Sequence, residues 1–309
     1  MSVSLTTTYA GEFSGKYIAA ALLSADTLDK GLITVMPNVK FKSVIQKAST
    51  DDIVKDATCD FQTDAGTLTL TEAILQPEEF QVNLDICKKT LHSSWEAEQM
   101  GYSAFDNLAP NFADFVLAHV AAKVADRTEK NIWGGSTATS GQFNGFTTLL
   151  DADGDFGNGV TGAAITAANV IAELGKTVDA IPTPVYGSED LFLYAASDVI
   201  RAYTRALGGF QSGGEGANGY ENKGNNQSLG SLFFDGIPVV PARGAADGTI
   251  IAAEKSNLFF GTGLLNDLNE VRVIDMAEND GSQNVRVVMR FTAGVQYAQV
   301  NDIVYRKTV

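Results

Sequence analysis

The stretch PNFADFVLAHVAAKVADRTEKNIWGG, residues 110–135, predicts a long helix around which the rest of the chain can be organised. Pro110 suits the first turn, because its fixed φ is already close to helical. Gly134 and Gly135 favour an end to the helix. Side chains at the spacing of one helix face are Leu108, Phe112, Phe115, Val116, His119, Val120 and Val124. We predict a spine helix over about 110–133, which would be about 35 Å long.

The residues before this helix predict extended structure. Residues 1–50 are irregular, with a short helical stretch over 17–25, a strand-like run over 32–35 and extended chain over 39–45. They hold too few apolar residues to fold alone and are interpreted as an arm.

Residues 51–91 predict a long hairpin or protruding β loop. Asp64-Ala65-Gly66 is a turn signal between two extended runs, Cys59 to Phe61 and Leu68 to Leu70. After Pro77, residues 80–86 alternate apolar and polar side chains, which is typical of a half-buried strand.

The residues after the spine helix predict a helical middle and a β-rich end. A turn-rich stretch over 151–162 precedes a helix over about 167–180. A strand end is expected at Val185-Tyr186, then a helix from an N-cap at Ser188 to about Leu207. Eight glycines make 208–230 a flexible loop. Strands are predicted near 236–241, 250–253, 271–274, 285–291, 294–297 and 303–305. The class is α+β, with antiparallel pairing among the last strands.

Charge excludes a protein that grips nucleic acid through phosphates. The 309 residues include 22 basic and 37 acidic ones, and the net charge of −15 has the wrong sign for phosphate binding. The charge is uneven, because residues 1–50 have five lysines against three acids, whereas residues 51–100 have three lysines against eleven acids. This difference would let segments of neighbouring copies attract one another, although ordinary surface variation would also produce it.

Two cysteines, Cys59 and Cys87, provide no disulfide framework. The sequence has no signal-peptide pattern and no apolar run long enough for a membrane span, so we expect a cytoplasmic protein that does not enter a membrane.

Searches for chemical motifs give no catalytic, cofactor or metal site. His119 lies on the apolar helix face, and His92 has no visible partner. Gly175-Lys176-Thr177 lacks the first glycine of a phosphate loop. The aspartates at 151–155 lack the glycine and glutamate of a calcium loop. We expect no enzyme and no cofactor, while scattered carboxylates that converge in the fold keep an acidic hydrolase or binding protein as an alternative.

Three stretches resemble one family in their order and spacing. They are EKNIWGG (129–135) followed by GFTTLL (145–150), then FDGIPVV (234–240), and then the run from Val285 through Phe291, Gly294 to Tyr297 and Asp302 to Tyr305. The chain resembles the major capsid proteins of tailed bacteriophages, whose fold is shared with encapsulins. The resemblance covers nearly the whole chain.

The resemblance implies a division of the chain into an arm and three structural parts. These are an N-terminal arm (1–50), an extended β loop (51–91), a peripheral domain (92–162 and 256–309) with the spine helix, and an axial domain (163–255) with the flexible loop 208–230. It also implies pentamers and hexamers that close into an icosahedral shell around double-stranded DNA, without sequence-specific binding.

The same resemblance implies partners and a location. A separate scaffolding protein and a portal are expected, and a decoration protein is compatible with the fold. The protein would belong to the virion capsid and assemble in the host cytoplasm. An encapsulin-like compartment with a cargo enzyme inside is the nearest alternative.

Contacts between copies are expected where opposite charges can meet. We hypothesise that the acidic block of one copy pairs with basic residues of its neighbour. The residues proposed for these contacts are Lys40, Lys42, Lys47, Asp60, Asp64, Glu78 and Glu79.

Overall fold

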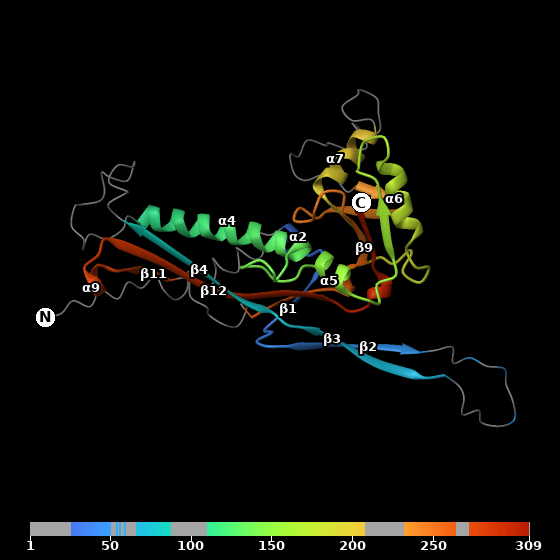
Figure 1. Ribbon diagram of the computed structural model, residues 1–309, viewed down its shortest axis with the longest axis horizontal. Helices are drawn as coiled ribbons and strands as arrows, with labels where there is room; N and C mark the ends of the chain where they lie inside the picture. Colours follow the sequence, from blue (N-terminus) through green and yellow to red (C-terminus); the bar gives the residue numbers. More distant parts are fainter. Residues whose placement is uncertain are drawn as a thin grey trace.

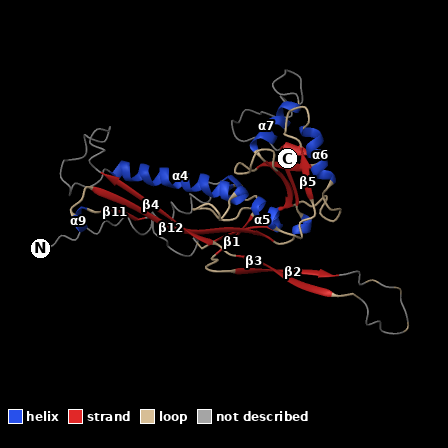
Figure 2. Cartoon of the chain, viewed as in Figure 1, coloured by secondary structure: helices blue, strands red, loops and turns tan. Residues whose placement is uncertain are grey.

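The computed structural model describes residues 26–50, 54, 56, 59, 66–87, 110–207, 232–263 and 272–308. Its helices are α2 (Asp26–Asp29), α4 (Pro110–Gly134), α5 (Phe146–Ala152), α6 (Val170–Asp179), α7 (Ser197–Ala206) and α9 (Ala277–Asp280), with short 3-10 turns at Lys255–Asn257 and Val300–Asp302. Its strands are β1 (Thr34–Pro37), β2 (Ser43–Thr50), β3 (Leu68–Leu75), β4 (Glu78–Cys87), β5 (Gly159–Gly162), β6 (Leu191–Ala195), β7 (Leu232–Phe234), β8 (Ile237–Pro241), β9 (Ile250–Glu254), β10 (Leu258–Thr262), β11 (Arg272–Asp275), β12 (Asn284–Tyr297) and β13 (Val304–Thr308). The predicted α+β class is confirmed (Figure 2).

A long helix and a long sheet form one half of the molecule. The predicted spine helix is confirmed as α4, which runs alongside β4 and β12 (Figure 1). The sheet has the order β1-β10-β12-β11, and β4 also pairs with β12. Val285, Val287 and Met289 alternate with more exposed residues along β12 and are buried. The alternation of apolar residues therefore defines the buried face of this sheet.

The second half is built on a six-stranded sheet with the order β5-β13-β9-β6-β8-β7, beside which α6 and α7 lie (Figure 1). Both faces of this sheet are buried. Tyr194 on β6 belongs to the core around Trp133, whereas its neighbours Leu193 and Ala195 belong to the core beneath α6 and α7. Trp133 packs against Tyr194 at 5.1 Å and Phe146 at 5.7 Å between ring centroids. One sheet thus separates two cores and joins the two halves.

A two-stranded hairpin of β2 and β3 projects from the body (Figure 1). Its ladder is antiparallel, from Ser43 opposite Leu75 to Thr50 opposite Leu68. An isolated two-stranded hairpin is marginal in water. Its stability must therefore come from the base of the hairpin or from a partner.

The ladder corrects the predicted hairpin. Leu68 pairs with Thr50, not with a residue near Phe61, so the hairpin begins at Ser43 within the segment assigned to the arm. The predicted strand over 80–86 is confirmed as β4, but it pairs with β12 and lies outside the hairpin. Alternation identifies a strand and does not identify its partner, which explains both errors.

The predicted helix from Ser188 to Leu207 is partly wrong. Its first part is the strand β6, and only Ser197–Ala206 is helical, while Val185-Tyr186 lies in a turn rather than at a strand end. The run Leu191–Ala195 is apolar on both faces because the sheet is covered on both sides, and such a run has no period that separates strand from helix.

The remaining elements follow the predictions with small changes. The helix expected over 167–180 is confirmed as α6, and the two runs expected over 285–297 form the single strand β12. Most of the last strands pair antiparallel, as predicted, but β13 also pairs parallel with β5. The turn-rich stretch 151–162 includes the end of α5 and the strand β5. The expected helix over 17–25, the loop 208–230 and His92 lie outside the described residues.

Candidate assembly surface

The described residues contain no cluster that resembles an active site. No three His, Cys, Asp or Glu side chains among them are grouped to hold a metal ion. Gly175-Lys176-Thr177 lies inside α6, where no phosphate loop can form. None of the helices in the described part of the chain is both long and apolar enough to cross a bilayer. The candidate functional features of the described residues therefore lie on the surface.

The β2–β3 hairpin presents large apolar side chains to solvent. Val44, Leu68, Leu70 and Ile74 are 50%, 60%, 72% and 42% exposed, and we call these four residues the apolar stripe. Val44 lies opposite Ile74, Ala48 opposite Leu70 and Thr50 opposite Leu68. Residues directly opposite, and residues two apart on one strand, point to the same face. The four side chains of the stripe therefore share one face of the ribbon.

The base of the hairpin is held by the body. Leu75 is fully buried, and Ala73, on the same face as Leu75, is buried as well. A Cβ on Gly261 of β10 would approach the Leu75 side chain to 2.8 Å, so glycine permits this close packing. The Gln296 Nε2 donates a hydrogen bond of 3.1 Å to the Ile74 carbonyl oxygen. These contacts fix the direction in which the hairpin leaves the body.

The apolar stripe is costly for a monomer. Burying one Leu, Val or Ile side chain contributes about 1.5–3 kcal/mol of free energy relative to leaving it exposed. In the monomer, the four residues of the stripe remain largely in water and do not gain this stabilisation. Gln46 and Glu72 lie opposite each other on the same face, between Ile74 and Leu70, so the apolar stripe consists of two apolar groups separated by one polar pair. Exposed apolar surface of this kind makes this face of the hairpin a candidate contact surface.

The proposed contact residue Lys47 lies on the other face of the hairpin and interacts within its own chain. It is near enough to Asp153 for its charge to act on that carboxyl. The pKa of Asp153 lies below its usual range, first because the Tyr297 hydroxyl donates a 2.6 Å hydrogen bond to it, then through the backbone N–H of Asp155, with Lys47 adding a smaller effect. Burial opposes this shift. The charge of Lys47 thus acts on a carboxyl of its own chain.

Two other proposed residues lie together. Lys40 and Glu79 line one open cavity of about 570 Å³ between the β1–β2 connection, β4, β12 and the end of β10. The remaining lining residues are Phe80, Gln81, Gly263, Arg290, Phe291 and Thr292. Arg290 was missed from the sequence, although it lies four residues from Arg286 on the more exposed face of β12, with Val288 between them.

The other proposed contact residues are less informative. The Lys42 Nζ lies 5.4 Å from the centroid of the neighbouring Phe41 ring, which is 71% exposed. Glu78 begins β4 and is exposed. Asp60 and Asp64 lie outside the described residues.

The segment that begins at α2 is fastened to the spine helix. The Glu129 carboxylate on α4 accepts hydrogen bonds from the Thr27 hydroxyl (2.6 Å), the Thr27 N–H (3.1 Å) and the Trp133 indole N–H (3.2 Å). Burial raises the pKa of Glu129, and these bonds oppose the rise. An ion pair between Asp26 and Arg243 adds a second link. The α2 segment is therefore held at one point on α4.

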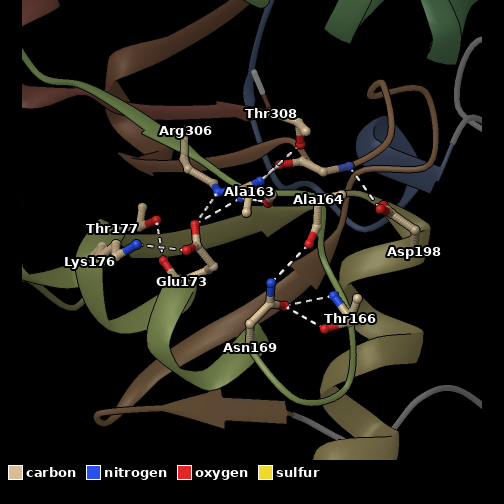
Figure 3. Close-up of polar contacts among 11 residues, drawn as sticks. Ala163, Ala164, Thr166, Asn169, Glu173, Lys176, Thr177, Asp198, Arg306 and Thr308 are labelled. Atoms are coloured by element: carbon tan, nitrogen blue, oxygen red, sulfur yellow. Dashed lines mark hydrogen bonds and ion pairs between the residues drawn. The ribbon is translucent and has the colours of Figure 1, made fainter.

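A buried polar cluster holds the six-stranded half together (Figure 3). Arg306 on β13 pairs with Glu173 on α6, and the Glu173 carboxylate also accepts from Lys176 at 2.7 Å. Arg306 donates to the carbonyl oxygen of Gly248, whose own N–H donates to Asp198 on α7. The cluster thereby joins β13, α6 and α7.

No protein-family model and no curated protein matches the chain. Solved structures match it over nearly its whole length. A chain in the capsid of an empty GTA particle has a TM-score of 0.59 at 15% identity, covering 94% of this chain and 90% of that one. A chain in the satellite phage P4 procapsid, which includes the size determination (Sid) protein, has a TM-score of 0.57 at 11% identity, covering 94% and 98%. A chain from Microbacterium phage Oxtober96 has a TM-score of 0.54 at 13% identity, covering 91% and 90%.

These likenesses are in the fold, since the identities are low. The chain has the fold found in phage capsid structures, and the fold expected from the sequence is confirmed. The match extends through both halves of the molecule rather than through one common motif.

Proposed function

We propose that this chain is the major capsid protein of a tailed bacteriophage, and that it assembles through pentamers and hexamers into the icosahedral shell around double-stranded DNA. The apolar stripe carries the proposal: a chain with a capsid fold also presents, on a projecting hairpin, an apolar face that its own body leaves exposed. A second copy of the chain supplies the missing cover.

The parts of the chain receive roles on this proposal. Residues 1–50 include the arm, and the extended loop begins at Ser43, where the ladder begins. The half with α4 and β12 is the peripheral domain, and the half with the six-stranded sheet is the axial domain, which gathers at the five- and six-fold axes. The role is structural rather than enzymatic, which agrees with the capsid folds of the matched structures.

Partners beyond the chain itself follow from shell assembly. We propose a separate scaffolding protein and a portal, with room for a decoration protein, and a location in the virion capsid after assembly in the host cytoplasm. The P4 procapsid structure includes a size determination protein, which supports the idea that shells of this fold take accessory proteins. The net charge of −15 suits a shell that encloses DNA without gripping its phosphates.

Light scattering during size-exclusion chromatography, followed by negative-stain imaging, tests the proposal. Rings of five or six copies, tubes or closed shells are the expected result. Shells filled with a cargo enzyme instead of DNA would favour the encapsulin-like alternative. A stable monomer of 32.8 kDa that stays monomeric with the candidate scaffolding protein, and that turns over a substrate, would contradict the shell and favour the acidic hydrolase.

A further inference from the structure

We propose that Asn257 is a pin that locks the angle between the two halves of the molecule, by binding the connection from β9 to β10 onto the connection from β12 to β13. The inference concerns the shape of a single copy, so it does not rest on the proposed function. It gives a mechanical role to a buried polar side chain at the place where the two halves meet.

The chain passes between the two halves in three described connections, which lie where the halves meet at one end of β12 (Figure 1). They are residues 153–158 from α5 to β5, the 3-10 turn Lys255–Asn257 from β9 to β10, and residues 298–303 from β12 to β13. Hinges between rigid parts usually lie at such element ends, where a few residues absorb a change in φ and ψ. These connections are therefore the places where the two halves could bend relative to each other.

Asn257 removes this freedom from the connection that follows β12. Its Oδ1 accepts hydrogen bonds from the N–H groups of Gln299 (2.7 Å) and Ala298 (3.0 Å), and its Nδ2 donates to the Gln299 carbonyl oxygen (2.8 Å). One amide, which can accept and donate at once, thus holds both backbone polar groups of Gln299. Gln299 has an extended backbone, with φ −110° and ψ 113°. Because Asn257 is only 6% exposed, water competes little for these bonds.

The turn that contains Asn257 is itself fastened from both halves. The Lys255 N–H donates a 2.9 Å hydrogen bond to the carbonyl oxygen of Asp190, just before β6. The Thr34 hydroxyl on β1 donates a 3.1 Å hydrogen bond to the Lys255 carbonyl oxygen. Since β6 belongs to the six-stranded sheet and β1 to the long sheet, the turn cannot rotate without breaking a bond to one half.

The connection from α5 to β5 is tied to the same place. The Asn158 Nδ2 donates a 2.6 Å hydrogen bond to the Asn301 carbonyl oxygen, and the Tyr297 hydroxyl donates one of 2.6 Å to the Asp153 carboxylate. The end of β12 and the connection after it are therefore bonded to both other connections. The Asn158 bond is exposed, so water can replace it, whereas Asn257 is buried. We therefore expect Asn257 to contribute most to the lock.

Distances between nitroxide labels, measured by double electron–electron resonance in the full-length chain, test the lock. The label sites are Lys123→Cys on α4 and Asp179→Cys at the end of α6, which are exposed and lie in different halves. The background is Cys59→Ser/Cys87→Ser, and an excess of unlabelled chain restricts the measurement to distances within one copy. The chain with Asn257 should give one narrow distance distribution, and Asn257→Ala should widen it about twofold or more.

The matched controls separate a loosened angle from a general loss of stability. Ser256→Ala changes an exposed side chain in the same turn and should keep the narrow distribution. A second label pair, Asp179→Cys/Arg205→Cys, lies on α6 and α7 within one half, and its distribution should stay unchanged in every variant. Asn257→Asp keeps the acceptor for the two N–H groups but loses the donor to the Gln299 carbonyl oxygen, so it should also widen the first distribution.

Several results would overturn the lock. They are a broad distribution with Asn257 in place, a narrow one in a folded Asn257→Ala variant, and equal broadening of both label pairs. Broadening by Ser256→Ala equal to that by Asn257→Ala would assign the angle to the turn as a whole. If Asn257→Ala does not fold, Asn257→Asp decides in the same way, and unfolding of both variants would assign Asn257 to stability rather than to shape. Shell assembly is judged separately, by light scattering and imaging.

Discussion

Arg306 and Glu173 form an ion pair of 2.8 Å in which the side chains are 0% and 5% exposed. Arg306 donates two hydrogen bonds to Glu173 and three more to the Gly248 carbonyl, the Ala163 carbonyl and the Thr308 hydroxyl. All five N–H groups of the guanidinium are therefore satisfied. Removal of one partner from such a pair leaves a buried charge unpaired, which costs more than the pair contributes.

Glu173→Gln should destabilise the subunit by about 3–5 kcal/mol at pH 7, because Arg306 would keep its charge without a counter-ion. Urea unfolding of the unassembled chain measures this difference. The matched control is Lys176→Gln. Its side chain is 56% exposed, so loss of its bond to Glu173 should cost under about 1 kcal/mol. Equal losses for the two variants would contradict the central role of Arg306.

The same pair makes stability depend on pH. The pKa of Glu173 lies below its usual range, first because Lys176 donates a hydrogen bond to it and then because of Arg306, while burial opposes the shift. A carboxyl with a lowered folded-state pKa contributes stability above its unfolded pKa and loses it as pH falls. The difference between wild type and Glu173→Gln should therefore shrink below about pH 4.5. A difference that stays constant from pH 7 to pH 3 would refute this assignment.

Gly145→Ala should destabilise the fold by about 1–3 kcal/mol, because a Cβ at this position would collide with the Asn131 carbonyl oxygen and the backbone of Trp133. The backbone there is fixed by the bond from the Gly145 N–H to the Gly135 carbonyl oxygen, 2.9 Å. Thermal unfolding provides the measurement. Gly154→Ala, whose Cβ would meet no atom within 4 Å, is the control and should change stability little.

Thr27→Val should loosen the segment at α2, because it removes the hydroxyl that donates to Glu129 and accepts from the Trp133 indole. A buried group left without its partner costs about 1–3 kcal/mol. Limited trypsin digestion should cut faster at Lys30, which is exposed just after α2. Thr27→Ser retains the hydroxyl and should digest like wild type. Equal digestion of both variants would show that the Thr27 hydroxyl does not fasten the segment.

Leu68→Ser/Leu70→Ser should impair assembly without destabilising the subunit, because both side chains are already exposed in the unassembled chain. We expect the critical concentration to rise by about tenfold or more, since each leucine loses about 1.5–3 kcal/mol of burial. Thr69→Ala/Thr71→Ala alters the opposite face of the same strand and is the control. Impaired assembly in the Thr69→Ala/Thr71→Ala control and not in the leucine variant would contradict this prediction, because it would place the contact on the hairpin face opposite the apolar stripe.

Elements with a strong local period could be predicted from sequence. The helix α4 is predicted nearly at its observed bounds, and Val120 and Val124 of the predicted helix face are buried. The strand β12 is predicted as two runs, 285–291 and 294–297, whose apolar residues repeat every two residues along one buried face. The run Leu191–Ala195 could not be assigned in this way, since the sheet is buried on both faces and the period disappears. The packing of both faces of β6 against the two cores therefore determines that this run is a strand.

Pairing and surface chemistry required the structure. The sequence indicated strands near Leu68 and Phe80 but not that the first pairs with Thr50 and the second with Phe291. Charge counting drew attention to Lys40 and Glu79, which the fold brings to one cavity, yet it also selected Lys47, whose charge acts on Asp153 of its own chain. Net charge does not show which face a side chain occupies.

An electron cryo-microscopy reconstruction of assembled particles is the most direct test of the proposed shell. We expect closed particles in which Val44, Leu68, Leu70 and Ile74 of each copy are buried against a second copy. A closed shell with this stripe open to solvent, or a chain that remains monomeric at every concentration and with a candidate scaffolding protein, would contradict assembly through the hairpin.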